Sequence, residues 1–352
     1  MKTRKERQNQ PVSLNDAAIH NQEENLANVE TVENEVVGDE NGGLEENHPN
    51  FIESNTNAIT LEDLKEKNVI PTFSDNSLTI SHQDFIGAVT DAARETFGEL
   101  TPVECRVSHP VIGRIPSAQH KKASELLDSE KTVFYQRMAF CCHVMGVRRE
   151  INGQTVRLCI GGARAYNEDK LYGRKQSLKF KVFVGWQVKV CSNLMLTCDG
   201  NSGTMECMTE ADIMQKTSGL YNGFKPKMEA TLYQLENLQS TPIPEELFCR
   251  IIGRMRLYQV LPVGEQRKLP ALAISDTAVN AMVKNYVTNG NFGKKDGTDI
   301  TCWNLMQLAN EAVKQSYIDK FIDRNQNCTD FAMGIQQAIT GKDTRGYSWF
   351  IN

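Results

Sequence analysis

Residues 177–191 alternate apolar and polar side chains almost without a break, which is the two-residue period of a β-strand. One face of this strand carries only apolar side chains: Leu178, Phe180, Val182, Val184, Trp186, Val188 and Val190. The opposite face carries Lys179, Lys181, Phe183, Gly185, Gln187 and Lys189. The pattern predicts a long strand that is buried on one side and shows solvent a basic face with one aromatic ring.

Further strands are predicted on either side of an Asn152-Gly153 pair. The flanking segments, 133–149 and 154–161, are apolar, and Asn-Gly between two such segments is the strongest short hairpin signal. Residues 194–198 add a short strand. These segments predict an antiparallel sheet within residues 130–200.

Helical periodicity appears before and after this sheet. A helix is expected at 82–97, with Ser81 as its N-cap, and a short helical segment near 117–127. Beyond residue 208, helices are expected near 209–218, 227–239, 244–260, 275–288, 300–323 and 328–340, with Asp299 capping the helix at 300–323. A block of strands followed by a block of helices predicts an α+β fold with a helical C-terminal half, 208–340.

The charge divides the chain at about residue 60. Residues 1–60 hold 12 acidic and 4 basic side chains, and residues 11–60 contain no Lys or Arg. Residues 61–352 hold 35 basic and 32 acidic side chains, a net of +3. We therefore expect a disordered acidic tail at 1–60 and a single α+β domain at 61–352. The tail either keeps the protein soluble, recruits a host or element-encoded protein partner, or competes with nucleic acid for the body.

The composition bounds the cellular setting. No apolar run approaches the ~20 residues of a membrane-spanning helix, and the basic start leads into no apolar stretch, so no signal peptide and no membrane partner are expected. The ten cysteines include no Cys-x-x-Cys pair, which is typical of buried free thiols in a reducing cytoplasm.

Motifs that carry chemistry are few. The sequence contains no Gly-x-Gly-x-x-Gly, no phosphate-binding Gly-x4-Gly-Lys-Ser/Thr and no His-Glu-x-x-His, so we predict no catalytic residue, no metal and no cofactor. Asp319 and Asp323, at i and i+4, are interpreted as a solvated helix face. An enzyme whose residues converge only in the fold stays open; Cys141, His143 or Asp199 in one deep pocket would support it.

The strongest functional signal is a basic stretch at 148–189, which holds ten Arg or Lys against three acids. Lys and Arg side chains that bind phosphates release counter-ions, and aromatic rings stack on bases. This composition therefore favours nucleic-acid binding. An ordinary solvated sheet would look the same. The predicted nucleic-acid-binding residues are Arg164, Tyr166, Tyr172, Arg174, Lys175, Lys179, Lys181, Phe183 and Lys189, with Arg250 and Arg254 on the helix at 244–260.

The chain also resembles a bacterial family catalogued as a domain of unknown function, number 3871. The resemblance is carried by residues 106–116, 160–167, 183–194 and 316–325, and it runs from about residue 75 to the C-terminus, leaving the tail outside. The Val-Cys-Ser-Asn stretch and a later Trp-x-Leu helix are distantly similar to phage and plasmid-like proteins. The resemblance implies a mobile-element setting and carries over no catalytic residue.

Together these observations predict a cytoplasmic, non-enzymatic accessory protein of a mobile element that binds single-stranded DNA during replication or recombination. The first alternative is a protein-interaction or host-interference factor that acts through the acidic tail. The second is an enzyme whose site is not visible in the sequence.

Overall fold

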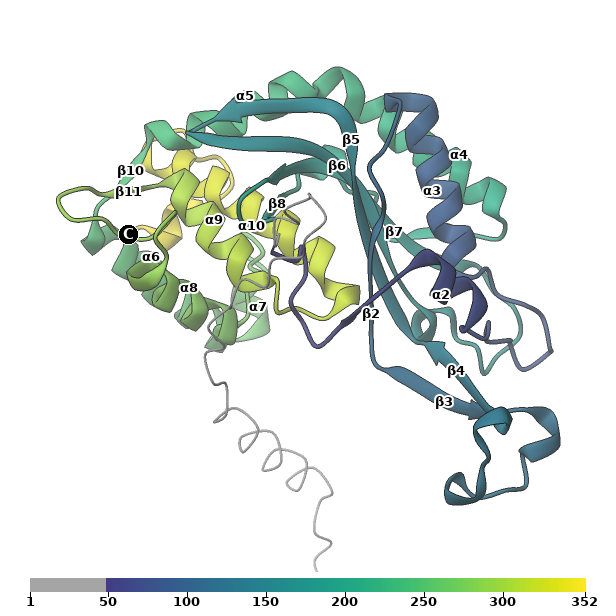
Figure 1. Ribbon diagram of the computed structural model, residues 1–352. Helices are drawn as coiled ribbons and strands as arrows, with labels where there is room; N and C mark the ends of the chain where they lie inside the picture. The colour runs from purple at the N-terminus through teal and green to yellow at the C-terminus, as the bar shows by residue number, and fades with distance from the viewer. Residues whose placement is uncertain (1–48) are drawn as a thin grey trace, which may run out of the picture. The chain divides into compact units, whose positions relative to one another are not determined.

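A curved antiparallel sheet forms the centre of the computed structural model, which describes residues 49–352 (Figure 1). Its strands follow the order β1-β2-β5-β6-β7-β8, and β9 also pairs with β7. The strand bounds are β1 Asn57–Ile59, β2 Glu104–Val107, β5 Arg137–Ile151, β6 Gln154–Ala165, β7 Leu178–Val188, β8 Leu194–Met195 and β9 Met205–Cys207. Every neighbouring pair is antiparallel, as the sequence predicts.

The hairpin between β5 and β6 turns at the predicted dipeptide. Ile151 pairs with Gln154, and Asn152 and Gly153 have φ angles of 50° and 71°. Both residues are therefore in the left-handed region that a two-residue type I′ turn requires. The predicted hairpin is confirmed.

Most helices lie close to their predicted positions. α3 spans His82–Phe97, and Ser81 and Asp84 form a capping box at its start. Between residues 49 and 300 the other helices are α2 Leu61–Glu66, α4 Glu210–Phe224, α5 Met228–Asn237, α6 Glu245–Val260, α7 Val263–Gln266 and α8 Asp276–Thr288. The segment predicted to be helical near 117–127 contains only short 3₁₀ turns.

The last two helices divide the chain differently from the prediction. α9 spans Cys302–Val313 and α10 spans Ile318–Ile339, so the expected helix at 300–323 is interrupted and α10 absorbs the one expected at 328–340. Thr301, not Asp299, caps α9. The helix is interrupted directly after Lys314, the C-cap of α9. Lys314 is buried, and its ammonium donates to the Cys191 backbone oxygen and to Glu311. The spacing of apolar residues in the sequence does not indicate these contacts between distant segments.

Both faces of the sheet are buried. On one face, β7 residues such as Val182 and Trp186 join a large apolar cluster with α3 and α4. On the other face, Phe183 packs in a second cluster with Phe321 of α10 and with Phe51. The prediction that this second face of β7 is exposed to solvent is wrong, because α10 and the segment before β1 cover it.

The folded body begins before the predicted boundary. Phe51 and Ile52 are fully buried, and β1 pairs with β2. The predicted disorder therefore does not hold for residues 49–60, whereas residues 1–48 lie outside the described part of the chain.

A two-stranded arm, β3 Pro110–Arg114 and β4 Lys131–Tyr135, projects from the central sheet at the lower right of Figure 1. Its strands pair with each other, and 3₁₀ turns connect them. A second small sheet joins β10 Pro242–Ile243 to β11 Ile300–Thr301.

Candidate nucleic-acid interface

The structure buries four of the residues that the sequence predicts for nucleic-acid binding. Arg164 is only 2% exposed, and its Nη2 lies 2.8 Å from Asp169 Oδ2. Its guanidinium also lies over the rings of Tyr166 and Phe180, each at 4.5 Å. Tyr166 stacks on the ring of His82 at 4.2 Å, and burial raises the pKa of its hydroxyl to about 12. These groups stabilise the core and do not form a surface.

Lys181 and Phe183 are also buried by contacts within the protein. Lys181 Nζ lies 2.8 Å from Asp323 Oδ2 and donates to the Asp319 backbone oxygen at 2.6 Å. Phe183 fills the space beside Gly161, where an added Cβ would lie 2.6 Å from the phenyl ring. The assignment of Lys181 and Phe183 to an exposed basic face is therefore corrected. Lys179 and Lys189, at the two ends of the strand, are partly exposed.

Three predicted residues do reach solvent on one loop. Tyr172 is fully exposed, and Arg174 and Lys175 are exposed beside it. The loop backbone is held by Ser74, whose amide donates to the Leu171 oxygen at 2.8 Å, and by Asp75, which accepts from the Lys175 amide at 3.3 Å. This small basic loop, with the partly exposed Lys179 and Lys189, is what the structure leaves accessible of the predicted aromatic and basic cluster at 164–189.

Arg250 and Arg254 bind the C-terminal residues. Arg250 Nη1 donates to the Ile351 oxygen at 3.1 Å, and Arg254 Nε donates to the Asn352 oxygen at 2.9 Å. Arg254 also lies over the Trp349 ring at 5.0 Å. Both guanidinium groups therefore fasten the chain end to α6.

The residues considered for catalysis do not meet in one pocket. Cys141 is buried against Cys159, which raises the pKa of the Cys141 thiol, and the His143 ring bonds to Gln187. Asp199 lies elsewhere, 2.6 Å from Lys227 Nζ. Within residues 49–352 no three His, Cys, Asp or Glu side chains are grouped to hold a metal ion.

Three hollows of the surface instead share lining residues, and Tyr317, which is not among the residues predicted from the sequence, lines two of them. The first has a volume of about 270 Å³, the second about 470 Å³ and the third about 440 Å³. The first two share Ser54, Asn55 and Tyr317, and the last two share Ser275 and Arg324. We call this set of hollows, connected by shared lining residues, the Tyr317 groove.

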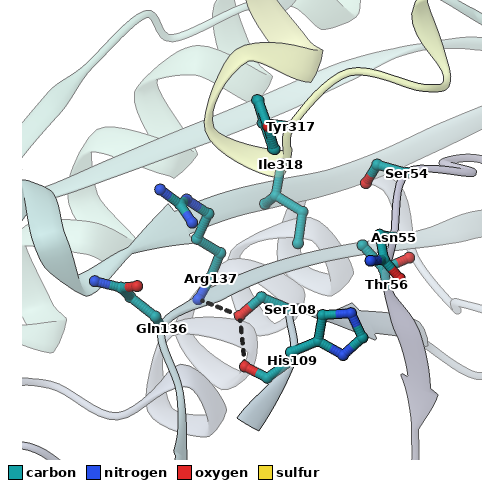
Figure 2. Close-up of a pocket in the computed structure, with 9 residues that line it drawn as sticks. All are labelled: Ser54, Asn55, Thr56, Ser108, His109, Gln136, Arg137, Tyr317 and Ile318. Atoms are coloured by element: carbon teal, nitrogen blue, oxygen red, sulfur yellow. Dashed lines mark hydrogen bonds between the residues drawn. The ribbon is translucent and has the colours of Figure 1, made fainter. Parts of the chain in front are cut away.

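Segments distant in the sequence build the first hollow. His109 and Gln136 lie at the base of the arm, Arg137 begins β5, and Tyr317 and Ile318 begin α10. Figure 2 shows Arg137 and His109 on two sides of this hollow, with Tyr317 beyond Ile318. α9 ends at Val313, and Tyr317 occupies the N-cap position of α10, where it is 71% exposed.

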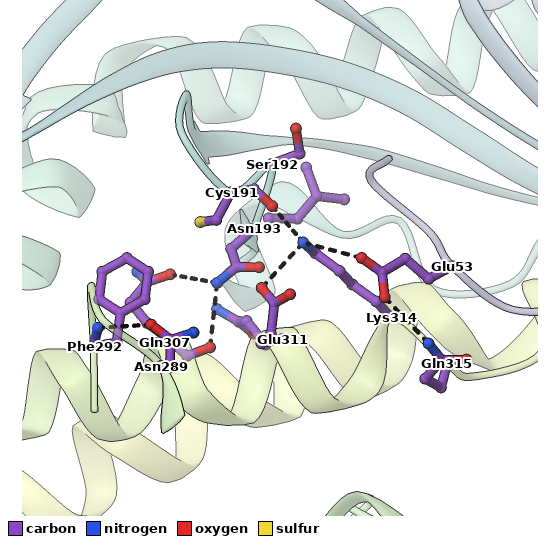
Figure 3. A network of polar contacts seen from close by, with 12 residues as sticks. Glu53, Cys191, Ser192, Asn193, Asn289, Phe292, Gln307, Glu311, Lys314 and Gln315 are labelled. Atoms are coloured by element: carbon purple, nitrogen blue, oxygen red, sulfur yellow. Dashed lines mark hydrogen bonds and ion pairs between the residues drawn. The ribbon is translucent and has the colours of Figure 1, made fainter. Parts of the chain in front are cut away.

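A polar network holds the segment that contributes Ser54 and Asn55 (Figure 3). The amides of Glu53 and Ser54 donate to the Lys314 backbone oxygen at 2.9 and 3.1 Å. The Lys314 ammonium lies 4.0 Å from Glu53 and 3.1 Å from Glu311. Burial raises the pKa of the Glu53 carboxyl, while the ammonium opposes that change. The network ties the start of the folded body to the end of α9.

The Tyr317 groove carries cations and hydroxyl groups. Lys320 is exposed, Arg324 Nη1 donates to Ser316 Oγ at 2.9 Å, and Arg137 Nε lies 3.2 Å from Asp319 Oδ1. The sequence offered a signal for this site: residues 106–116 and 316–325, both used in the family resemblance, contribute His109 and Tyr317. Residue composition alone pointed to 148–189 instead.

No helix in the described part of the chain is long and apolar enough to cross a membrane. No curated protein and no solved structure matches the chain.

A family model matches residues 31–351, so the match starts well before residue 75 and includes part of the acidic tail, contrary to the sequence expectation. The chain belongs to the family described as "Domain of unknown function, B. Theta Gene description (DUF3871)".

Proposed function

We propose that this protein binds single-stranded nucleic acid along the Tyr317 groove. The observation that carries the proposal is the exposed Tyr317 side chain, which lines two of the three hollows, with Lys320 and Arg324 lining the third. A run of hollows suits a polymer better than a single deep pocket does. The mobile-element setting belongs to the same proposal, with single-stranded DNA handled during replication or recombination.

The chemistry of the groove supports a strand with separated bases. An exposed aromatic ring stacks on any base and contributes about 1–3 kcal/mol per base. The cations attract phosphates, while the hydroxyl and amide groups of Ser54, Asn55 and Thr56 are suited to hydrogen bonds with phosphate and sugar oxygens. Asp319 and Asp323 repel phosphate less than free carboxylates would, because Arg137 and Lys181 lie beside them.

The test is fluorescence anisotropy of a labelled oligothymidylate with the full chain, in wild type and in Tyr317→Ala. Loss of one stacked base raises Kd roughly 5- to 150-fold. Tyr233→Ala is the matched control, because Tyr233 is 69% exposed but lies on α5 outside the groove. It leaves Kd unchanged.

Tyr172→Ala distinguishes the groove from the basic loop that the sequence predicted. If Tyr172→Ala weakens binding and Tyr317→Ala does not, the strand binds at the loop and the groove assignment is wrong. If the wild type binds no oligonucleotide at low salt, the proposed function itself is wrong.

A further inference from the structure

A second, separate pocket of about 300 Å³ lies between α5 and α10. α5 contributes Gln234 and Asn237, and α10 contributes Asp330, Gln336 and Gln337. Tyr317 precedes Asp330 by 13 positions, which is about 20 Å along a helix axis. We call this cavity the amide pocket, after the four primary amides in its lining.

The charged side chains of the lining have partners within the protein. Asp199 lies 2.6 Å from Lys227, and burial raises the pKa of Asp330, which accepts from Gln326 at 3.2 Å. The Arg345 guanidinium lies over the Tyr347 ring at 4.9 Å and donates to Gln337 at 3.4 Å. The lining holds one cation, Arg345, and two carboxyl groups, so we expect the pocket not to select phosphate or carboxylate ligands.

The pocket keeps hydrogen-bonding capacity in reserve. Thr197 is 8% exposed, and its hydroxyl has no hydrogen-bond partner among the described residues. The Gln336 amide already donates to the Asn237 backbone oxygen at 2.8 Å, and the oxygens of Gln337 and Asn237 already accept from Arg345 and Ser240. The Gln234 side chain makes no hydrogen bond with the described residues, so its amide offers both a donor and an acceptor, the pair that a vicinal diol requires. Tyr233 is the one aromatic ring and Met333 the one aliphatic side chain in the lining, so the pocket lacks the two flat apolar walls that would sandwich a nucleobase.

We propose that the amide pocket binds an uncharged, polyhydroxylated molecule of monosaccharide size. The volume lies at the lower end for small-molecule sites, which limits the ligand to about one sugar ring. Tyr233, exposed on α5, offers its ring to the apolar face of the sugar. This inference does not depend on nucleic-acid binding in the Tyr317 groove.

A cysteine in the lining provides the measurement. Cys198 and Cys249 are the two exposed cysteines of the chain, and only Cys198 lines the amide pocket. Iodoacetamide labelling of the full chain, followed by peptide mass spectrometry, gives the alkylation rates of Cys198 and Cys249 in one sample. Cys249, on α6, serves as the internal reference.

The probes are glucose, galactose, mannose and N-acetylglucosamine. At a sugar concentration ten times Kd, Cys198 labelling slows about tenfold, because only free protein reacts, while Cys249 labelling is unchanged. Gln234→Ala raises the Kd obtained from this protection roughly 3- to 10-fold, the loss expected for one hydrogen bond. Tyr317→Ala leaves the protection as in wild type.

The opposite results overturn the inference. Absence of protection by all four sugars, with Cys198 still reactive, shows that the pocket does not bind such a molecule. Stronger protection by adenosine, uridine or inorganic phosphate shows that it selects another chemistry.

Discussion

Lys181 of β7 and Asp323 of α10 meet at 2.8 Å between the sheet and the helix that covers it. Asp319, one turn earlier, lies 3.2 Å from Arg137 of β5. The i, i+4 carboxylates that suggest a solvated helix face therefore bind two cations of the sheet. This relationship explains why the basic pattern of β7 does not produce a basic surface.

Lys181→Ala is expected to lower the free energy of unfolding by about 1–3 kcal/mol, because it leaves the Asp319 backbone oxygen without its lysine donor. Asp323→Asn costs less than about 1 kcal/mol, since Asp323 is half exposed. Urea denaturation followed by circular dichroism measures both. A Lys181→Ala variant with unchanged stability and lost oligonucleotide binding would restore the sheet face as the site.

The salt dependence of oligonucleotide binding reports the cations of the Tyr317 groove. Lys320→Ala/Arg324→Ala should make the slope of log K against log salt shallower by about 1.4, or about 0.7 per lost phosphate contact. Arg174→Ala/Lys175→Ala removes two charges from the exposed loop and should leave the slope unchanged. Anisotropy titrations over a salt series compare the two double variants; the reverse pattern contradicts the groove.

His82 predicts acid sensitivity. Its Nε2 donates to the Tyr135 oxygen at 2.7 Å, and burial, with Arg164 nearby, lowers its pKa from 6.5 to about 3. Between these values the unfolded chain binds a proton that the folded protein excludes. Stability therefore falls as the pH drops from 6.5 towards 3, by up to about 1.4 kcal/mol per pH unit.

Chemical denaturation across this pH range measures the slope. His82→Gln should lower stability at pH 7, because the ring stacks on Tyr166, and should make the slope shallower. An unchanged slope in His82→Gln would assign the acid sensitivity to other groups.

Gly161 is expected to be intolerant of any side chain. A Cβ there would lie 2.1 Å from the Phe140 backbone oxygen and 2.6 Å from the Phe183 ring. Gly161→Ala should destabilise the fold by about 1–3 kcal/mol or more in thermal or urea unfolding. Gly219→Ala is the matched control, because its Cβ meets no atom within 4 Å; in α4 it should raise stability by up to about 1 kcal/mol.

Native thiol reactivity tests the burial pattern. Eight of the ten cysteines are buried, and burial raises the pKa of groups such as Cys105 and Cys302 to about 12. Because the thiolate is the reactive form, Ellman's reagent should modify two thiols rapidly in native protein and all ten in urea. Rapid reaction of more than two would show that the core opens.

The sequence by itself determined the local elements. Ser81 and Asp84 cap α3, Asn152-Gly153 closes the β5–β6 hairpin, and the alternation at 177–191 produces β7, because each signal depends on residues close together in the chain. The α+β class follows from the order of these elements.

Only the tertiary structure decided which faces are covered and where the surface is hollowed. The sequence pattern of a strand lysine is the same whether its side chain is solvated or, as for Lys181, binds a carboxylate 142 positions away. The Tyr317 groove likewise joins residues 54, 109, 137 and 317, which no period connects. Burial and convergence depend on contacts between distant segments, and those contacts exist only in the folded chain.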